Sequence, residues 1–406
     1  MHTRKLMVVF SILTVGFCGC AMTPKAPAGR SRGERAPGFS VYQVLPNEVL
    51  RGSNYRLAER VFVQGYQYVF TIKSDFGEIT AKGRHMLSLR LRELKSIEAA
   101  RKLSKYPLIV DGVLTPLRDT EKGLDLIINE PFEAIDRAPE GLELMVDQYT
   151  DPADRRAGSP TRRKIAVELD CDPETRNPVL KKLLDKLTLY KLGGSLLTKG
   201  AMAFIPIPGL GALSMTAQIK ELIVNSPPSV INGQIYRELE VAGVETYTRF
   251  RFRYSSAFTT VQRLQLMEQF RALKDVQNRA ALIEIAAKAH TEAEALSTIH
   301  KGKMLADIQK RQPIRLLKFA GLFPLAVLGN GTHVLICPYD YVTSTQEVDK
   351  YIDAYRASSP NVTTVLLTAG RVSPAVLKKV EFAHIRIVEE GEFTGDQAEP
   401  ANKEYI

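Results

Sequence analysis

The spacing of apolar residues predicts a β-hairpin followed by a helix early in the chain. Residues 60–80 are rich in Val, Phe, Tyr and Ile, and the turn-forming residues 74–77 divide them into two strands. The next apolar residues recur every three or four positions, as on one face of a helix: Leu87, Leu91, Leu94 and Ile97. We expect the cationic residues of this helix to lie mostly on its opposite, solvated face: Arg84, Arg90, Arg92 and Lys95. The pattern predicts a small α+β unit.

The centre of the chain is predicted to be helical. Proline recurs between Pro116 and Pro152, which limits any helix in that part to a few turns. Two longer amphipathic helices follow within residues 161–192, separated by aspartate-proline and asparagine-proline turns. The polar residues around Cys171 indicate an exposed connection between these two helices.

Residues 193–226 have the most unusual composition of the chain. The stretch 201–217 carries no charge over seventeen residues, which is the lower limit for a membrane-spanning helix. Prolines and glycines interrupt its middle: Pro206, Pro208, Gly209 and Gly211. Two short helices joined by a corner therefore fit better than one long helix. The pattern allows both a buried helical hairpin and a hairpin that dips into a membrane.

Beyond this segment the pattern predicts a strand and then long helices. Residues 244–258 alternate arginine with aromatic side chains, which is typical of a strand with a basic edge and an aromatic face. From Thr260 to Lys310 apolar residues return at helical spacing, with alanines that allow a close neighbouring helix. His290 and His300 lie at this stripe, but ten residues of helix separate them by about 15 Å, too far for one metal ion.

The most regular pattern lies between Leu317 and Glu390. Two apolar segments flank the tight turn at 329–331, which predicts a hairpin. A helix is expected from Ser344, where Glu347 completes a capping box, and another from Ser373. Apolar strands at 362–370 and 384–390 complete a strand-helix-strand-helix-strand order. This order predicts a small parallel sheet.

Composition indicates folded domains, because 45% of the 406 residues are apolar and only 25% are charged. We expect an α+β fold class, mainly helical, with a small C-terminal α/β module of βαβαβ type. The predicted division of the chain is as follows: a signal peptide, 1–19; a disordered tether, 20–40; a small α+β unit, 41–110; a helical region with the apolar hairpin, 111–230; a strand with long helices, 231–316; the α/β module, 317–390; and a disordered tail, 391–406.

The net charge of +10 would by itself suggest binding to nucleic acid. The charge is unevenly placed: residues 24–110 hold 16 basic and 7 acidic residues, net +9, whereas residues 119–154 hold 2 basic and 11 acidic residues, net −9. Blocks of opposite sign so close along one chain indicate contact with each other, or with one partner each. We therefore expect no nucleic acid among the partners.

The first twenty residues have the order of a secretory signal. Arg4 and Lys5 precede an apolar run, 6–17, that is too short to span a bilayer as a helix. Residues 17–20, Phe-Cys-Gly-Cys, resemble the lipobox of bacterial lipoproteins, in which a small residue precedes the cysteine that receives diacylglycerol. The resemblance implies a lipid on Cys20, which follows Gly19, and not on Cys18, which follows a bulky Phe. Cleavage after Ala21, which would release a soluble periplasmic protein, is the alternative.

The lipobox resemblance also implies a location. The residue after Cys20 is Ala21, where lipoproteins retained in the inner membrane commonly have aspartate, so the resemblance implies the outer membrane, facing the periplasm. The polar segment up to Ser40 is expected to act as a tether. Its arginines either reach anionic head groups or are merely solvated: Arg30, Arg32 and Arg35. We expect membrane contact through the N-terminal lipid and, in addition, an envelope protein as partner.

Two further features bear on the folded body. Residues 164–184 resemble a family of uncharacterised exported bacterial proteins, in which a basic-apolar helix, an aspartate-proline turn and a helix beginning Asn-Pro-Val-Leu follow one another. The resemblance implies a coherent fold and carries no activity with it. Cys171 and Cys337 can form a disulfide in the envelope, but one lies in a polar segment and the other in an apolar strand, which favours two free thiols.

The sequence contains no G-x-S-x-G elbow, phosphate-binding P-loop, H-E-x-x-H or C-x-x-C motif. We therefore expect a binding or scaffolding component of the envelope, without catalytic residues, metal or cofactor. The alternative is an envelope hydrolase at the strand ends of the C-terminal module. There, Thr368, Gly370 and Arg371 precede the N-terminus of a helix, a position that suits an anion. Insertion of residues 193–226 into a membrane is a third possibility.

Overall fold

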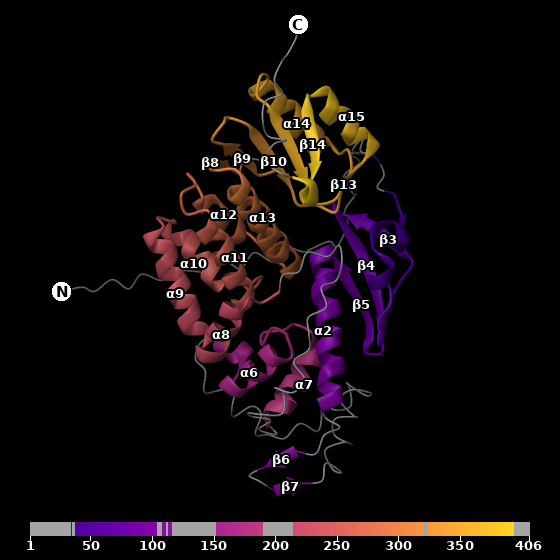
Figure 1. Ribbon diagram of the computed structural model, residues 1–406, viewed down its shortest axis with the longest axis vertical. Helices are drawn as coiled ribbons and strands as arrows, with labels where there is room; N and C mark the ends of the chain where they lie inside the picture. The colour runs from indigo at the N-terminus through magenta and orange to yellow at the C-terminus, as the bar shows by residue number, and fades with distance from the viewer. Residues whose placement is uncertain are drawn as a thin grey trace, which may run out of the picture. The chain divides into compact units, whose positions relative to one another are not determined.

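The computed structural model describes residues 34, 37–103, 108–110, 113–115, 152–189, 214–319 and 323–393. Figure 1 shows an N-terminal sheet beside the long helix α2, a group of helices, and a second sheet near the C-terminus. The α-helices are α1 (Val41–Val44), α2 (Arg84–Leu103), α5 (Pro152–Ala157), α6 (Pro160–Glu168), α7 (Pro178–Leu189), α8 (Ala217–Asn225), α9 (Pro228–Val241), α10 (Thr246–Tyr254), α11 (Thr260–Ala272), α12 (Ala280–Ala286), α13 (Glu292–Arg311), α14 (Gln346–Ser358) and α15 (Pro374–Phe382).

The N-terminal sheet is antiparallel and is covered by α2. Its strands are β1 (Phe39–Ser40), β2 (Tyr55–Leu57), β3 (Arg60–Gln64), β4 (Gln67–Ser74) and β5 (Gly77–Lys82). Strand β4 pairs with β2 and β3 along one edge and with β5 along the other. The predicted hairpin is therefore present, but a further two-residue turn at Gly65 and Tyr66, both with positive φ, divides its first half. Alternate residues of β4 are buried against the apolar face of α2: Tyr68, Phe70 and Ile72.

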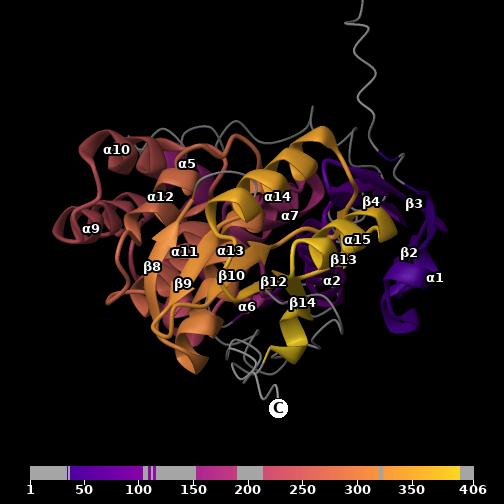
Figure 2. The same ribbon diagram turned by 90° about the horizontal axis from the view of Figure 1, so that it is seen from above.

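The C-terminal sheet is mixed, with strand order β14-β12-β10-β9-β8. Figure 2 shows these five strands following one another across the sheet. Their bounds are β8 (Ile314–Lys318), β9 (Leu325–Leu328), β10 (His333–Cys337), β12 (Thr364–Thr368) and β14 (Ile385–Glu389). The last three are parallel, as the strand-helix alternation predicts, whereas β9 pairs antiparallel with both β10 and β8. Strand β8 was not expected, because the region of long helices was predicted to extend to residue 316.

Both faces of this sheet are buried because side chains alternate across it. Val334, Ile336 and Val365 belong to the large apolar cluster that includes α11 and α13. Their neighbours Leu335, Cys337 and Leu366 belong to a second cluster with the apolar sides of α14 and α15. The sheet therefore forms the middle layer between the central helices and these two helices (Figure 1).

One apolar cluster joins the N-terminal sheet, the central helices and one face of the C-terminal sheet. It draws members from Val41 through to Phe393. Helix α2 packs against α7 and α13, and α13 packs in turn on α11 and on β10. The part of the chain from Gly33 onward thus contains its whole described core, and it forms one compact unit.

The structure is α+β as expected, but the expectation of a mainly helical chain is wrong. About 53% of the structure is helix and 19% is strand, and the strands form several sheets of mixed topology. The reason is that strands of two or three residues are too short to show a period of two, so they were overlooked. Residues 108–110 and 113–115, for example, form a small antiparallel pair, β6 (Leu108–Val110) with β7 (Val113–Thr115), at the edge of the region expected to be helical.

The expected strand within residues 244–258 is also wrong, because this segment forms helix α10. Glu245 caps it by accepting hydrogen bonds from the N–H groups of Tyr247 and Thr248, at 2.9 and 2.8 Å. Arg249 and Phe252, three residues apart, are its buried side chains. The helical region predicted from Thr260 to Lys310 contains α11, α12 and α13. Helix α14 begins one residue later than expected, with Thr345 as its cap and without the capping box.

The apolar segment 193–226 lies mostly outside the described residues, which resume at 214. Its described end contains the whole of α8, which is capped by Thr216. In the part of the chain that the structure describes, no helix has the length and apolar character needed to cross a bilayer.

Asp340 joins the C-terminal sheet to the N-terminal unit. Its carboxylate accepts hydrogen bonds from the N–H groups of Tyr68 (3.0 Å) and Arg84 (3.2 Å), the latter in the first turn of α2. Burial raises the pKa of Asp340, and the nearby Arg84 guanidinium opposes that effect. Gly370 packs against the other side of this residue: a Cβ at Gly370 would lie 2.2 Å from the carbonyl oxygen of Asp340 and 2.4 Å from that of Tyr339.

Gly370→Ala is therefore expected to destabilise the protein by about 1–3 kcal/mol, since the added methyl group would meet backbone atoms that have no room to move. Gly233→Ala is the matched control, because Gly233 lies within α9 and a Cβ there meets no atom within 4 Å. This control should stabilise the protein by up to about 1 kcal/mol. Urea unfolding followed by circular dichroism measures both, and an equal effect of the two substitutions would contradict the packing described here.

Candidate functional site

The structure brings together the three loop residues singled out in the sequence, at the C-terminal end of β12. Thr368 is buried, and its hydroxyl donates to the carbonyl of Gly370 at 2.9 Å and accepts from the N–H of Gly370 at 3.3 Å. The N–H groups of Ala369 and Arg371 donate to the carbonyls of Cys337 and Asp340, at 2.9 and 3.0 Å. All three consecutive N–H groups therefore donate within the protein, so in this conformation the loop offers none of them to an anion.

Cys20, the predicted lipid attachment point, lies outside the described residues, as does the whole predicted signal peptide. Of the two histidines considered for a metal, His290 is exposed and His300 is buried, with its Nε2 3.2 Å from a carboxylate oxygen of Glu390. Across the described ranges, no three or more His, Cys, Asp or Glu side chains are arranged to hold a metal ion. Cys171 and Cys337 are both free thiols and both buried.

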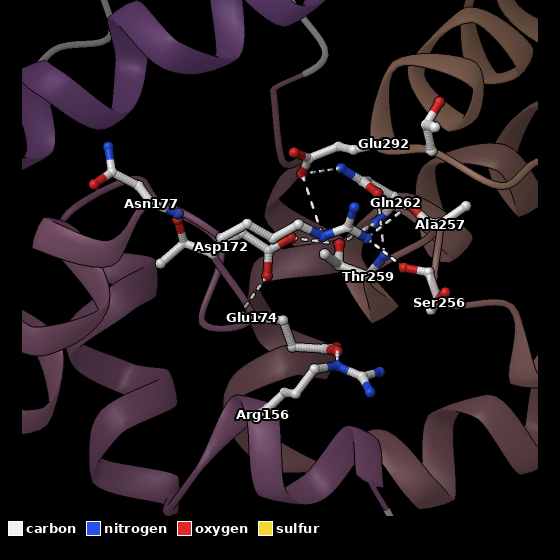
Figure 3. A network of polar contacts seen from close by, with 12 residues as sticks. Arg156, Asp172, Glu174, Asn177, Ser256, Ala257, Thr259, Gln262 and Glu292 are labelled. Carbon is white, nitrogen blue, oxygen red and sulfur yellow. Dashed lines mark hydrogen bonds and ion pairs between the residues drawn. The ribbon is translucent and has the colours of Figure 1, made fainter. Parts of the chain in front are cut away.

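The densest group of buried polar side chains lies elsewhere, between α2, the segment 170–177 and the first turns of α11 and α13 (Figure 3). Four carboxylates meet there: Glu93, Asp172, Glu174 and Glu292. We call these four residues and their hydrogen-bond partners the carboxylate network. Charged side chains are rarely buried without partners, so the network needs a physical account.

Arg90 links two of the carboxylates. Its guanidinium contacts Glu93 at 2.7 Å and Glu292 at 2.6 Å, so it bridges α2 and the first turn of α13. Burial alone would lower the pKa of Arg90, but the two carboxylates outweigh burial and raise it. Glu93 also accepts hydrogen bonds from the hydroxyl of Thr175 at 2.6 Å and from the amide of Asn177 at 3.4 Å. Arg90, whose charge was predicted to lie on a solvated helix face, is thus a half-buried cross-link.

Asp172 and Glu174 attach the segment 170–177 to the start of α11. Asp172 accepts from the hydroxyl of Thr259, the cap of α11, at 2.5 Å, and from the N–H of Glu174 at 2.8 Å. Glu174 accepts from the N–H of Thr260 at 2.8 Å and from the Nε of Arg156 at 3.0 Å. Figure 3 shows these side chains converging from separate elements.

Asp172 differs from the other three carboxylates. Each of those forms an ion pair with Arg90 or Arg156, whereas the partners of Asp172 are a hydroxyl and a backbone N–H group. Burial, and next the neighbouring Glu174, raise the pKa of Asp172 to about 7, while the hydroxyl of Thr259 lowers it. This carboxyl group therefore exchanges its proton near neutral pH. The neighbouring Cys171 is buried as well, and burial raises the pKa of its thiol well above the usual value. A protonated, enclosed thiol is a poor nucleophile.

A small cavity of about 30 Å³ adjoins the network, lined among others by His85, Glu93, Cys171, Asp172 and Gln262. A volume of this size accommodates one or two water molecules and no organic substrate. The arrangement can therefore hold a proton and ordered water, and its hydrogen bonds connect four elements. These properties suit a structural centre better than a catalytic one.

Sequence reasoning missed this network. The segment 168–177 is dense in acidic and amide residues, which was taken as the mark of an exposed turn, so the expected exposure of Cys171 is wrong. The available signal was the concentration of four acidic residues in ten positions. Their partners Arg90 and Glu292 come from distant segments, and sequence spacing alone does not identify such pairs.

Comparison with known proteins gives no significant match to a protein-family model, a curated protein or a solved structure.

Glu93→Ala is expected to lower the free energy of unfolding by about 3–5 kcal/mol, because it leaves Arg90 with one carboxylate and removes the acceptor of two further buried groups. Glu238→Ala is the matched control, since Glu238 forms a two-pronged ion pair with Arg271 at the surface. Its loss should cost less than about 1 kcal/mol. Denaturant unfolding measures both; similar costs would show that burial of the network is unimportant.

Asp172→Asn should make the protein less sensitive to pH. The folded-state pKa of about 7 exceeds the ordinary value of 3.8, so between these values the folded state binds one more proton than the unfolded chain. The stability contributed by that proton is complete below about pH 4 and falls by about 1.4 kcal/mol per pH unit until about pH 7. Asparagine has no proton to lose, so the variant should gain on the wild type between pH 5 and pH 8. Thermal unfolding at both pH values measures the stability of the variant relative to the wild type, and this difference must shift in favour of the variant at pH 8.

Proposed function

We propose that this chain is a lipid-anchored protein of the bacterial envelope, held through Cys20, whose folded body acts as a binding or scaffolding component. The observation that carries the proposal is the order of residues 4–20: two cations, an apolar run and a small residue before the cysteine. Several acyl chains on one residue give a long-lived attachment, since each buried methylene contributes about 0.8 kcal/mol. Ala21 stands where lipoproteins retained in the inner membrane commonly have aspartate, which supports the outer membrane, on its periplasmic side, as the location of the protein.

The geometry of the body supports binding over catalysis. The N–H groups of residues 369–371, where a hydrolase site was considered, are engaged in internal hydrogen bonds. The carboxylate network encloses space for water only, and its one thiol is held protonated by burial. An oxyanion needs N–H donors that are free before the substrate arrives, and neither place supplies them. The hydrolase alternative therefore gains no support from the geometry.

Metabolic labelling with radioactive palmitate tests the anchor. The wild-type chain should incorporate label and Cys20→Ala should not, because only Cys20 would carry the lipid. Cys18→Ala is the matched control: it removes a cysteine two positions away and should leave labelling unchanged. Mass spectrometry of the mature protein should find a modified Cys20 as the first residue. Label on Cys20→Ala, or a mature chain that begins at Met22, would refute the anchor.

A further inference from the structure

Large apolar side chains exposed to solvent are concentrated on α9 and α10. Of nine such side chains in the described residues, five belong to this pair of helices and their connection: Val230, Val241, Tyr247, Phe250 and Tyr254. Figures 1 and 2 both show α9 and α10 at the margin of the helices, on the side away from α2. Exposed apolar groups are common singly, but a contiguous set marks a surface that meets a membrane or a protein.

The three aromatic rings of α10 form one stripe along the helix. Tyr247, Phe250 and Tyr254 are spaced by three and four residues, which puts them within about 60° of arc. They are 64%, 54% and 56% exposed, and the rings of Phe250 and Tyr254 lie 4.7 Å apart. Arg249 and Phe252 point to the opposite side and are buried. Helix α10 therefore presents an aromatic face outward, while the buried ring of Phe252 anchors the helix to the core.

Arginine flanks the stripe on both sides. Helical spacing places Arg251 beside one edge and Arg253 beside the other. Their guanidinium groups lie over aromatic rings, Arg251 at 5.8 Å from the ring of Tyr247 and Arg253 at 5.4 Å from that of Tyr254. Residues 246–254 include no acidic residue. The face is thus both aromatic and cationic.

Two of the three neighbouring carboxylates are paired with other arginines, whereas Glu245 keeps its negative charge at the N-terminal end of α10. Glu240 pairs with Arg249 at 2.9 Å. Glu238 pairs with Arg271, and Glu245 accepts the two N–H groups at the start of α10. Those hydrogen bonds lower the pKa of Glu245.

We propose that the aromatic face of α10, defined as Val241, Tyr247, Phe250, Arg251 and Tyr254 with Arg253, binds the interfacial layer of an anionic lipid bilayer. Tyrosine and arginine suit the head-group region because each combines an apolar part with a polar one, and phenylalanine reaches the acyl boundary. The two arginines match anionic head groups in charge. A docked protein partner of acidic character is the competing occupant.

The proposal rests on the anchor at Cys20, which favours the bilayer over a protein partner. Phe39 lies nineteen residue steps after Cys20, so covalent geometry keeps the start of the folded body within about 65 Å of the lipid. At that distance the bilayer is the surface most often encountered, and even a weak contact is populated. The lipid would limit the distance of the body from the membrane, and the aromatic face would determine the orientation of the body.

Vesicle co-sedimentation tests the aromatic face separately from the anchor. The chain from Gly33 to Ile406 contains the whole described core and lacks Cys20, so any binding is independent of lipidation. It should bind vesicles of phosphatidylethanolamine with phosphatidylglycerol, more weakly at high salt and more weakly to phosphatidylcholine alone. The double variant Phe250→Ser, Tyr254→Ser should lower the partition coefficient about tenfold or more, because it lacks the two aromatic rings whose transfer from water into the bilayer favours binding.

Phe382→Ser is the matched control. Phe382 is 69% exposed on α15 and also lies beneath an arginine, Arg356, at 4.4 Å. Its loss should leave vesicle binding unchanged, and circular dichroism should show all variants folded. An equal loss with Phe382→Ser, unchanged binding of the double variant, or no binding of the parent chain would overturn the proposal. Failure of palmitate labelling at Cys20 would refute the anchor while leaving this measurement intact.

Discussion

The burial of three carboxylates, Glu93, Glu174 and Glu292, beside the half-buried Asp172 is the constraint on which the rest of the structure depends. Moving a charge out of water costs several kcal/mol unless partners replace the lost hydration. Arg90 meets this requirement for Glu93 and Glu292, and hydroxyl, amide and N–H donors meet it for the others. Because these partners come from several elements, the carboxylates stay satisfied only when α2, α11, α13 and the segment before α7 meet in this one arrangement.

This requirement extends outward through α13. One end of the helix carries Glu292 into the carboxylate network, and its apolar side covers the C-terminal sheet. That sheet in turn carries Asp340, whose carboxylate holds the first turn of α2. The contacts thus form a closed circuit from α2 through α13 and the sheet back to α2. In such a circuit the polar groups inside are engaged in holding elements together, which leaves the outer faces for contact with partners.

Sequence periodicity predicted well the elements that bury a simple apolar face. Helix α2, with Leu87, Leu91, Leu94 and Ile97 all fully buried, and the parallel strands β10, β12 and β14 are of this kind. Periodicity failed where partners distant in sequence decide the outcome. The arginines of α2 were expected in solvent because their carboxylates lie in other segments, and Cys171 was expected to be exposed because its polar neighbours were assumed to face water. The lipid anchor, by contrast, rests on sequence alone, since residues 1–33 lie outside the described structure.

Helix α10 shows why a period-two pattern misled and what the error reveals. In a strand, alternate residues share a face, so the aromatic residues Phe250, Phe252 and Tyr254 would all lie on one buried side. In the helix only Phe252 of these three is buried, and the other rings are exposed together with Tyr247. A segment selected only for packing would bury most of its aromatic area, as each ring contributes about 1.5–3 kcal/mol when removed from water. A helix that leaves three rings in solvent beside two arginines therefore retains apolar area that folding alone does not use. With the tether proposed at Cys20 the body would be free to turn about that point, and we propose that the aromatic face of α10 fixes its orientation on the membrane.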